Sequence, residues 1–133
     1  MKDNTVVIVS AVLLALICSI FFTRQVKAEE LTASWYSIDS LKMEGTWHNG
    51  IERRMANGQR FNDNGFTCAS WDYPLGSSVL VRNIANGKEV TVTVTDRTAR
   101  RFKGKRIDLS AEAFKVLAPL SQGLVKVSVE RIG

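Results

Sequence analysis

The chain has 133 residues, of which 45% are hydrophobic and 23% are charged, and this length leaves room for one domain. Its formal net charge of +5 is a mild basic excess spread along the chain, which suits an anionic cell-envelope surface and argues against nucleic-acid binding. One histidine and two cysteines exclude a metal site built from such ligands. We therefore expect neither a metal nor a cofactor, and we expect a monomer.

The N-terminal segment has the features of an export signal. Lys2 precedes an apolar run over residues 5–22, and Val26-Lys27-Ala28 offers the small residues that a signal peptidase needs. We predict cleavage after Ala28, which leaves a domain over residues 29–133. One alternative is a retained membrane anchor, because the run is close to the length of a spanning helix. Another is a lipoprotein signal at Cys18, although the bulky Ile17 precedes this cysteine. All three predict a secreted, periplasmic or envelope-bound protein.

Four short segments have the pattern of β-strands. They cover residues 31–36, 78–83, 90–95 and 125–130, and valine alternates with threonine, lysine or serine in the last two. Asn86-Gly87 is a typical hairpin turn between the second and the third. These segments predict a mainly β fold, a small barrel.

One helix is expected between the last two strands, with Ala111, Phe114 and Leu117 as its apolar face. Asp108 or Ser110 can cap its start, and Pro119 ends it. Residues 37–54 show no periodicity and are expected to form a long loop. Cys68 is the only cysteine beyond the N-terminal segment, and we expect it to be a small buried residue.

Four motifs together resemble a known family. They are ASWY (residues 33–36), MANGQRF (55–61), PLGSSVLVRNIANGKEVTVTVTDR (74–97) and KRIDLSAEAF (105–114). In order and spacing this sequence resembles the RlpA-like (rare lipoprotein A) domain over residues 31–131, and more distantly the first domain of expansins. The resemblance implies a six-stranded double-psi β-barrel with one short inserted helix. It also implies a bacterial envelope protein that acts on peptidoglycan by lytic transglycosylation.

Cleavage of a glycosidic bond needs a carboxylic acid that protonates the departing oxygen. Asp96 is the first candidate, because it ends the Val/Thr strand and matches the aspartate of the family's Asp-Arg-Gly motif. The competing interpretation is an aspartate that only caps a turn. The chain continues with Thr98-Ala99 where the family usually has Gly-Pro, so the turn after Asp96 is expected to differ.

The resemblance also exposes three replacements. Gln59, Asn62 and Ser70 stand where the family usually has glutamate, aspartate and histidine, and none of them can deliver a proton at neutral pH. Asp72 lies two residues beyond Ser70 and would share its face on an extended segment. A pair of Asp72 and Asp96 across a groove would restore acid–base chemistry, whereas a turn residue before Pro74 is the alternative for Asp72.

Sugar rings stack on aromatic side chains, and their hydroxyl groups bond to amides and guanidinium groups. Of the adjacent Trp35 and Tyr36, the tyrosine is the better candidate for a groove, because its hydroxyl needs a polar partner. Trp47 and His48 are candidates for a rim, and the basic run over residues 100–106 for contact with anionic wall polymer. The candidate substrate-binding residues are Gln59, Tyr36, Trp71, Asn57, Ser70 and Arg97.

Three functions follow. The first is an endolytic lytic transglycosylase that acts on peptidoglycan glycan strands and leaves 1,6-anhydromuramyl ends. The second is a non-catalytic, expansin-like module that binds or loosens polysaccharide, which the three neutral replacements favour. The third is an endoglucanase-like hydrolase, which needs both aspartates with a water molecule between them.

Overall fold

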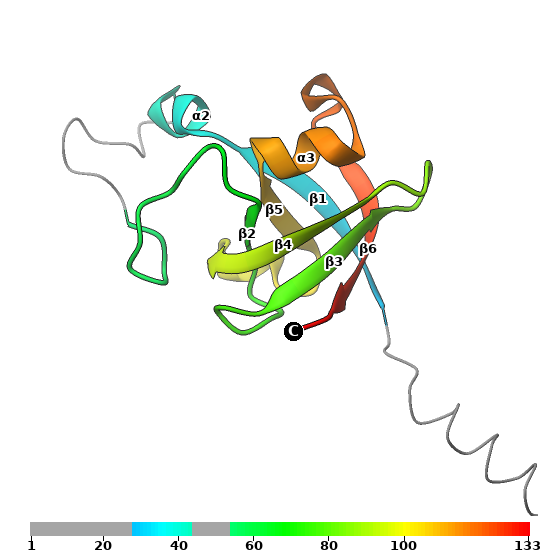
Figure 1. Ribbon diagram of the computed structural model, residues 1–133, viewed down its shortest axis with the longest axis horizontal. Coiled ribbons are helices and arrows are strands. Elements are labelled where there is room, and N and C mark those ends of the chain that lie inside the picture. Colours follow the sequence, from blue (N-terminus) through cyan, green and yellow to red (C-terminus); the bar gives the residue numbers. More distant parts are fainter. Residues whose placement is uncertain (1–27, 44–53) are drawn as a thin grey trace, which may run out of the picture.

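The computed structural model describes residues 28–43 and 54–133, and six strands in it close into a β-barrel (Figure 1). The order around the barrel is β1-β5-β2-β4-β3-β6. The pairs β1/β5 and β2/β4 are parallel, and the other four pairs are antiparallel. The strands are β1 (Glu29–Tyr36), β2 (Thr67–Ala69), β3 (Ser78–Asn83), β4 (Glu89–Asp96), β5 (Arg106–Ser110) and β6 (Val125–Arg131).

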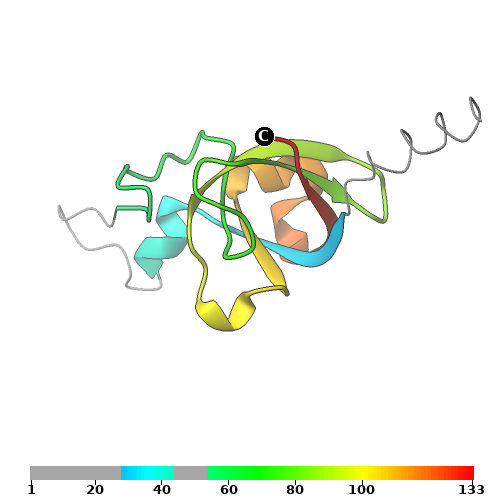
Figure 2. The same cartoon turned by 90° about the horizontal axis from the view of Figure 1, so that it is seen from below.

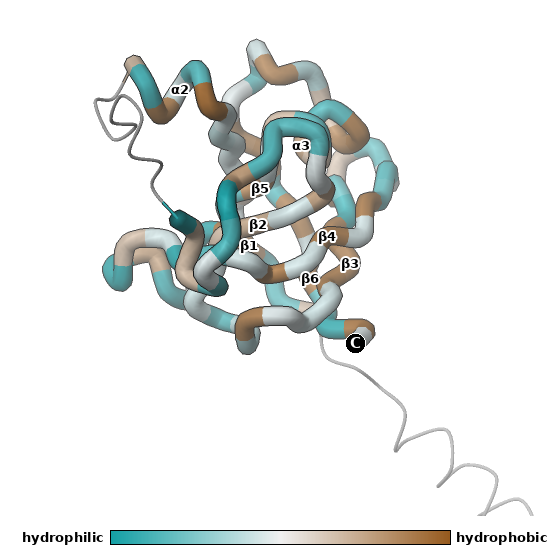
Figure 3. Tube along the Cα trace, turned by 60° about the vertical axis from the view of Figure 1, so that its left-hand side comes forward, coloured by the Kyte–Doolittle hydropathy of each residue, from teal (hydrophilic) through white to brown (hydrophobic). Residues whose placement is uncertain are grey.

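The core confirms the alternating pattern of the sequence. Val90, Val92 and Val94 of β4 are buried while their threonine neighbours Thr91 and Thr93 are not. Figure 3 shows the same alternation of hydrophobic and paler residues along the strands. The side chains of β1, β3, β5 and β6 fill the barrel in the same way, so one continuous apolar core holds the domain together.

The helix α3 (Ala111–Leu117) is the one that the sequence predicted, and it packs against β1, β4 and β5. Phe114 and Leu117 are fully buried in the barrel core. Ser110 caps this helix: its Oγ accepts a hydrogen bond from the Ala113 N–H and donates one to the Gly65 carbonyl (2.6 Å). The alternative cap, Asp108, does not perform this role, because it lies within β5 and faces away from the core.

The prediction of a loop over residues 37–54 is wrong at the start of that range, where Ile38–Met43 form the short helix α2. Ser37 and Ser40 bond to each other's backbone N–H groups, and the Asp63 carboxylate accepts the Ile38 N–H at 2.8 Å. Ile38 and Leu41 pack on a second apolar cluster that includes Phe61. Six residues are too few for a helical period to emerge from the sequence.

Two 3₁₀ turns complete the described structure: η1 (Arg100–Phe102) between β4 and β5, and η2 (Leu120–Gln122) after α3. The view in Figure 2 shows the segment that carries η1, in yellow, projecting from the barrel. No helix within residues 28–43 and 54–133 is long and apolar enough to cross a membrane. The predicted signal or anchor and the candidate rim residues Trp47 and His48 lie outside the described residues.

Ser110→Ala should destabilise the fold by about 1–3 kcal/mol, because it removes a helix cap and leaves the partly buried Gly65 carbonyl without its donor. Urea denaturation followed by circular dichroism measures this change. Ser121→Ala, the same change at an exposed position, should alter stability by less than about 0.5 kcal/mol. Equal effects of the two variants would contradict the assignment of the cap.

Candidate functional site

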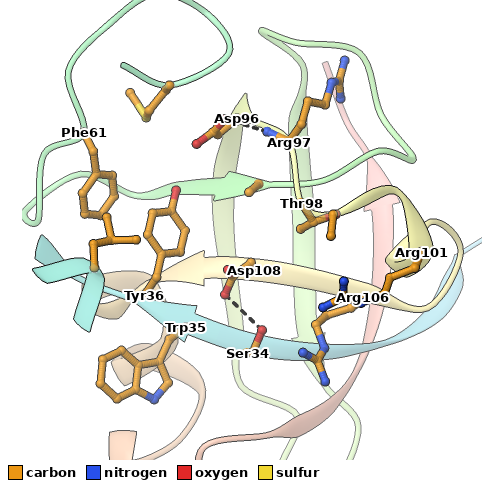
Figure 4. A pocket seen from close by; sticks show the side chains of 14 residues that line it. Ser34, Trp35, Tyr36, Phe61, Asp96, Arg97, Thr98, Arg101, Arg106 and Asp108 are labelled. Atoms are coloured by element: carbon orange, nitrogen blue, oxygen red, sulfur yellow. Dashed lines mark hydrogen bonds between the residues drawn. The ribbon is translucent and has the colours of Figure 1, made fainter. Parts of the chain in front are cut away.

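A pocket of about 680 Å³ opens on the outer face of the barrel, beside the ends of β1, β4 and β5 (Figure 4). This volume is typical of small-molecule and oligosaccharide sites. Segments that are distant in the sequence meet there, which makes the pocket a product of the closed fold. Its lining consists of Ser34, Trp35, Tyr36, Leu41, Met55, Phe61, Ala69, Asp96, Arg97, Thr98, Ala99, Arg101, Arg106 and Asp108.

Asp96 reaches the pocket through an irregularity at the end of β4. Cys68 pairs with Val94, but the next residue of β2, Ala69, pairs with Asp96, so Thr95 is the extra residue of a β-bulge. The Asp96 Oδ1 accepts hydrogen bonds from the backbone N–H groups of Ala56 (2.9 Å) and Arg97 (2.8 Å). The structure therefore places the predicted acid–base residue in the pocket, with its carboxylate held from two sides.

A second pocket carboxylate, that of Asp108, was missed by the sequence reasoning about catalysis. Ile107 and Leu109 face the core, so Asp108 between them faces outward, opposite Ser34 of β1. The Ser34 hydroxyl donates a hydrogen bond to the Asp108 Oδ1 at 3.0 Å. The alternation of Ile107, Asp108 and Leu109 was the available signal, and the nearby helix start led to the interpretation as a cap.

Tyr36 forms part of the pocket wall, and so does its neighbour Trp35, although the sequence had favoured Tyr36 alone for the groove. The Tyr36 ring packs on Phe61 with the centroids 4.6 Å apart. Its hydroxyl is buried and interacts with the Thr67 side chain, whereas the Thr98 hydroxyl is buried without a hydrogen-bond partner among the described residues. Trp35 donates its indole N–H to the Leu120 carbonyl at 3.0 Å and packs on the core.

Burial keeps the Tyr36 hydroxyl and the Cys68 thiol in their neutral forms. Burial raises the pKa of the Tyr36 hydroxyl far above its usual 10.0, and the charges of Asp96 and Asp108 raise it further. Burial also raises the pKa of the Cys68 thiol to about 12, with the Asp108 charge acting in the same direction and Arg97 against it. The thiolate form of Cys68 is therefore absent at neutral pH, which agrees with the predicted structural role.

Gln59 and Asn57 are not among the lining residues. Both lie on an exposed turn in which Gly58 has a φ of 85°. The Asn57 side chain accepts the Gln59 N–H at 3.0 Å and donates to the Gln59 Oε1 at 3.3 Å. The same turn contributes the Ala56 N–H to Asp96, so it supports the pocket through its backbone.

Ser70, Trp71 and Asp72 also lie outside the pocket lining. Ser70 is fully buried, and its hydroxyl accepts the Asp72 N–H at 3.0 Å. Trp71 donates its indole N–H to the Thr98 carbonyl, and the Asp72 Oδ1 accepts the Gly104 N–H at 2.8 Å. The structure thus brings Asp96 together with Asp108, and it uses Asp72 to anchor the segment after η1.

Arg97 lines the pocket, but its guanidinium group is engaged elsewhere. It donates to the carbonyl oxygens of Ser70 and Tyr73, both at 2.6 Å, and it lies 5.4 Å from the Trp71 ring centroid. In Figure 4 the guanidinium group extends away from the two carboxylates. The described residues contain no group of three or more histidine, cysteine, aspartate or glutamate side chains that could hold a metal ion.

Comparison with known proteins agrees with this geometry. The family described as "Lytic transglycolase" matches residues 28–129. The chain belongs to this family. Relatives of this chain at 40% and 42% identity are named RlpA, so the resemblance inferred from the motifs is confirmed.

Two curated relatives in the family illustrate the similarity. The probable endolytic peptidoglycan transglycosylase RlpA of Synechocystis sp. is 40% identical over 99 residues, which are 74% of this chain and 27% of that protein. The endolytic peptidoglycan transglycosylase RlpA of Rickettsia bellii is 42% identical over 99 residues, 74% of this chain and 40% of that protein. The chain thus spans less than half the length of these relatives.

The family fold is seen in a solved structure of a Clavibacter michiganensis expansin in complex with cellohexaose. It superposes with a TM-score of 0.58 at 20% identity and covers 80% of this chain and 51% of the expansin. Similarity at this identity concerns the fold. The double-psi β-barrel expected from the motifs is confirmed.

The chain contains two tyrosines, and burial raises the pKa of both Tyr36 and Tyr73 far above 10.0. Because the folded state retains these protons, tyrosinate absorbance at alkaline pH should be nearly absent at about pH 11 and should appear together with unfolding. Stability from this source is constant at neutral pH and declines as the pH rises above the tyrosine pKa of the unfolded chain. A spectrophotometric titration with and without urea measures this, and ordinary titration near pH 10 in the folded protein would contradict it.

Proposed function

We propose that the chain is an extracytoplasmic lytic transglycosylase that cleaves the glycan strands of peptidoglycan and leaves 1,6-anhydromuramyl ends. The observation that carries this proposal is the presence of two carboxylates, those of Asp96 and Asp108, in one pocket of about 680 Å³. The relatives named as endolytic peptidoglycan transglycosylases support the same reaction.

In the proposed reaction Asp96 donates a proton to the glycosidic oxygen as the bond to the anomeric carbon breaks. The 6-hydroxyl of the same muramyl residue then bonds to the anomeric carbon and returns its proton to Asp96. No water is consumed, and the carboxyl group ends in its starting state. Asp108, oriented by Ser34, faces the positive charge that develops on the sugar ring and lowers the barrier electrostatically.

Tyr36 and Thr98 are proposed to contact the sugar, because both line the pocket. A neutral phenol is the form that can donate a hydrogen bond, and the raised pKa of Tyr36 keeps it in that form. Asp108 takes the place that Asp72 held in the sequence-based pair. Gln59, Asn57 and Trp71 retain a proposed contact with the polymer outside the pocket.

The second candidate is a non-catalytic wall-binding module. Ser70 favours it, since this residue replaces the family's histidine and is used inside the protein, with no exposed side chain left for substrate. A binder of this kind would hold the polymer in the same pocket and release no product. Product analysis therefore distinguishes the two functions directly.

Asp96→Asn should lower the rate of release of anhydro-sugar products from peptide-free peptidoglycan by about 10²–10⁴, because an amide cannot supply the proton. Asp108→Asn should lower the rate at least about tenfold, while Asn retains an oxygen for the Ser34 hydroxyl. Mass spectrometry of the soluble products measures both changes.

Asp72→Asn is the matched control and should retain nearly full activity, since its carboxylate bonds to the Gly104 N–H outside the pocket. A loss with Asp72→Asn as large as that with Asp96→Asn would contradict the proposed pair. Products with reducing ends would point to hydrolysis. Co-sedimentation with the polymer without any product would establish the binding module.

A further inference from the structure

The segment that follows β4 is held against the connection between β2 and β3. The first residues of this segment, residues 97–99, line the pocket. The Arg97 guanidinium group donates to the carbonyl oxygens of Ser70 and Tyr73, which flank the middle of that connection. This part of the pocket wall therefore keeps its place through contacts with a neighbouring loop, in addition to the hydrogen bonds of the barrel.

Trp71 lies at the centre of these contacts. Its indole N–H donates to the Thr98 carbonyl. The guanidinium carbons of Arg97 and Arg100 lie 5.4 Å and 5.3 Å from the centroid of its ring, a distance typical of cation–π contacts. One half-buried side chain thus contacts three residues of the segment after β4.

The backbone that Trp71 contacts is the backbone that holds the proposed acid. The Asp96 Oδ1 accepts the Arg97 N–H at 2.8 Å, and this bond is drawn in Figure 4. The Arg97 side chain and the Thr98 carbonyl, on either side of that N–H along the chain, both contact the indole. Rotation of the backbone there would turn the N–H away from the carboxylate, and it would break the contacts with Trp71. The orientation of the Asp96 carboxylate therefore depends on Trp71.

The turn after Asp96 lacks the restraint of regular secondary structure. Residues 97–99 belong to no strand or helix. The Ala99 N–H forms no hydrogen bond with another described residue. Ala99 has φ −61° and ψ 140°, and a proline ring fixes φ near the same value without needing an N–H. A proline at this position can therefore restrict the turn from within the backbone, independently of Trp71.

We propose that Trp71 is a positioning residue for the transglycosylation, because its indole fixes the turn that orients the Asp96 carboxylate in the pocket. This inference rests on the proposed function. Small displacements of a reacting group are costly, since a shift of about 1 Å can lower a rate by about 10²-fold. Direct contact of Trp71 with the polymer is the competing role, and it would act on substrate binding instead of the chemical step.

The first experiment is steady-state kinetics of full-chain variants on a soluble, peptide-free glycan oligosaccharide of one defined length. Trp71→Phe keeps an aromatic ring but removes the N–H donor, and it should lower kcat about tenfold with KM unchanged. Trp71→Ala removes the ring as well and should lower kcat by about 10²-fold. A loss confined to kcat is expected of a group that orients the acid, whereas a lost sugar contact raises KM.

The matched control is Tyr73→Phe, which removes a donor carried by an aromatic ring from the same connection. The Tyr73 hydroxyl lies 3.4 Å from the Val129 carbonyl and 3.5 Å from the Glu29 carboxylate, both away from the segment after β4. The Tyr73 carbonyl that accepts from Arg97 is retained in this variant. Tyr73→Phe should therefore keep the kcat of the reference chain.

Proline at position 99 provides a rescue that separates orientation from general stability. The double variant W71F/A99P should recover most of the kcat lost in Trp71→Phe, because the proline restricts the turn that the indole no longer holds. A loss of activity caused by weakened packing elsewhere in the barrel would not respond to a restraint at this single position.

A second readout does not depend on activity. The Arg97 N–H is bonded to the Asp96 carboxylate, and its hydrogen exchange under native conditions should be about tenfold faster in Trp71→Phe. The Asn83 N–H, bonded to the Lys88 carbonyl in the hairpin between β3 and β4, should exchange at an unchanged rate. Two-dimensional NMR measures both amides in the same sample.

A raised KM with unchanged kcat in Trp71→Phe would assign this residue to polymer contact and overturn the positioning role. Equal losses of kcat in Trp71→Phe and Tyr73→Phe would overturn it too, and so would a W71F/A99P variant no faster than Trp71→Phe. Exchange that is unchanged at Arg97, or equally faster at Asn83, would have the same meaning. If the reference chain releases no product, the proposed function fails, and the exchange of the Arg97 N–H still decides whether Trp71 fixes the turn.

Discussion

The pocket depends on the two hydrogen bonds that the Asp96 carboxylate accepts. One comes from Arg97, the next residue along the chain after the end of β4, and the other comes from Ala56, on the turn that carries the MANGQRF motif. A third bond between the Asn57 N–H and the Thr95 carbonyl runs beside them at 3.1 Å. The turn is thereby fixed against the end of β4, and Met55 and Phe61 become a wall of the pocket.

This arrangement gives Asp96 a structural as well as a chemical role, and the two roles use different properties of the side chain. The bonds to Ala56 and Arg97 need an oxygen acceptor, which an amide also provides. The proposed proton transfer needs an ionisable group, which an amide lacks. Asparagine at this position therefore separates the two roles, whereas alanine would release the turn and disturb the pocket wall at the same time.

The distribution of charge in the pocket follows from the strand register. Asp108 and Arg106 are on the outer face of β5, with the buried Ile107 and Leu109 on the opposite face. One strand thus contributes a carboxylate and a guanidinium two residues apart to the same opening. With the aromatic wall of Tyr36 and Phe61 beyond Asp108, the pocket has an apolar side, an acidic centre and a basic side. A polymer with hydroxyls, apolar ring faces and anionic substituents is complementary to this order.

Residue patterns predicted the strands that have a regular alternation of buried and exposed residues. They did not predict the elements whose conformation depends on a single hydrogen bond or cap. The alternation in β4 and β6 located both strands, and Ser110 capped the helix as one of two expected options. The three residues of β2 are too few to show a period, and α2 exists because Ser37 and Asp63 cap it. The barrel itself was predicted from the ordered motifs.

The candidate site was predictable only in part, for the same reason. Asp96 and Tyr36 reach the pocket as expected, because the end of a strand and the polarity of a hydroxyl are visible in the sequence. Asp72 was paired with Ser70 on the assumption of an extended segment, but the Ser70 hydroxyl accepts the Asp72 N–H, a short-range bond typical of a turn. Asp108 was interpreted as a helix cap because it lies two residues before Ser110, which caps α3.

The structure shows what the three neutral residues that replace the family's ionisable ones contact. Asn62 accepts the Asn64 N–H at 3.0 Å on an exposed turn, and Gln59 bonds to Asn57, so both amides serve the local loop. Ser70 has no exposed surface, and a histidine in its place would have to displace its neighbours. The two carboxylates that line the pocket belong to the barrel itself, Asp96 at the end of β4 and Asp108 within β5. A site reduced to these two strands keeps its carboxylates in a fixed relation even where the loops of the family have changed, because the barrel hydrogen bonds set that relation.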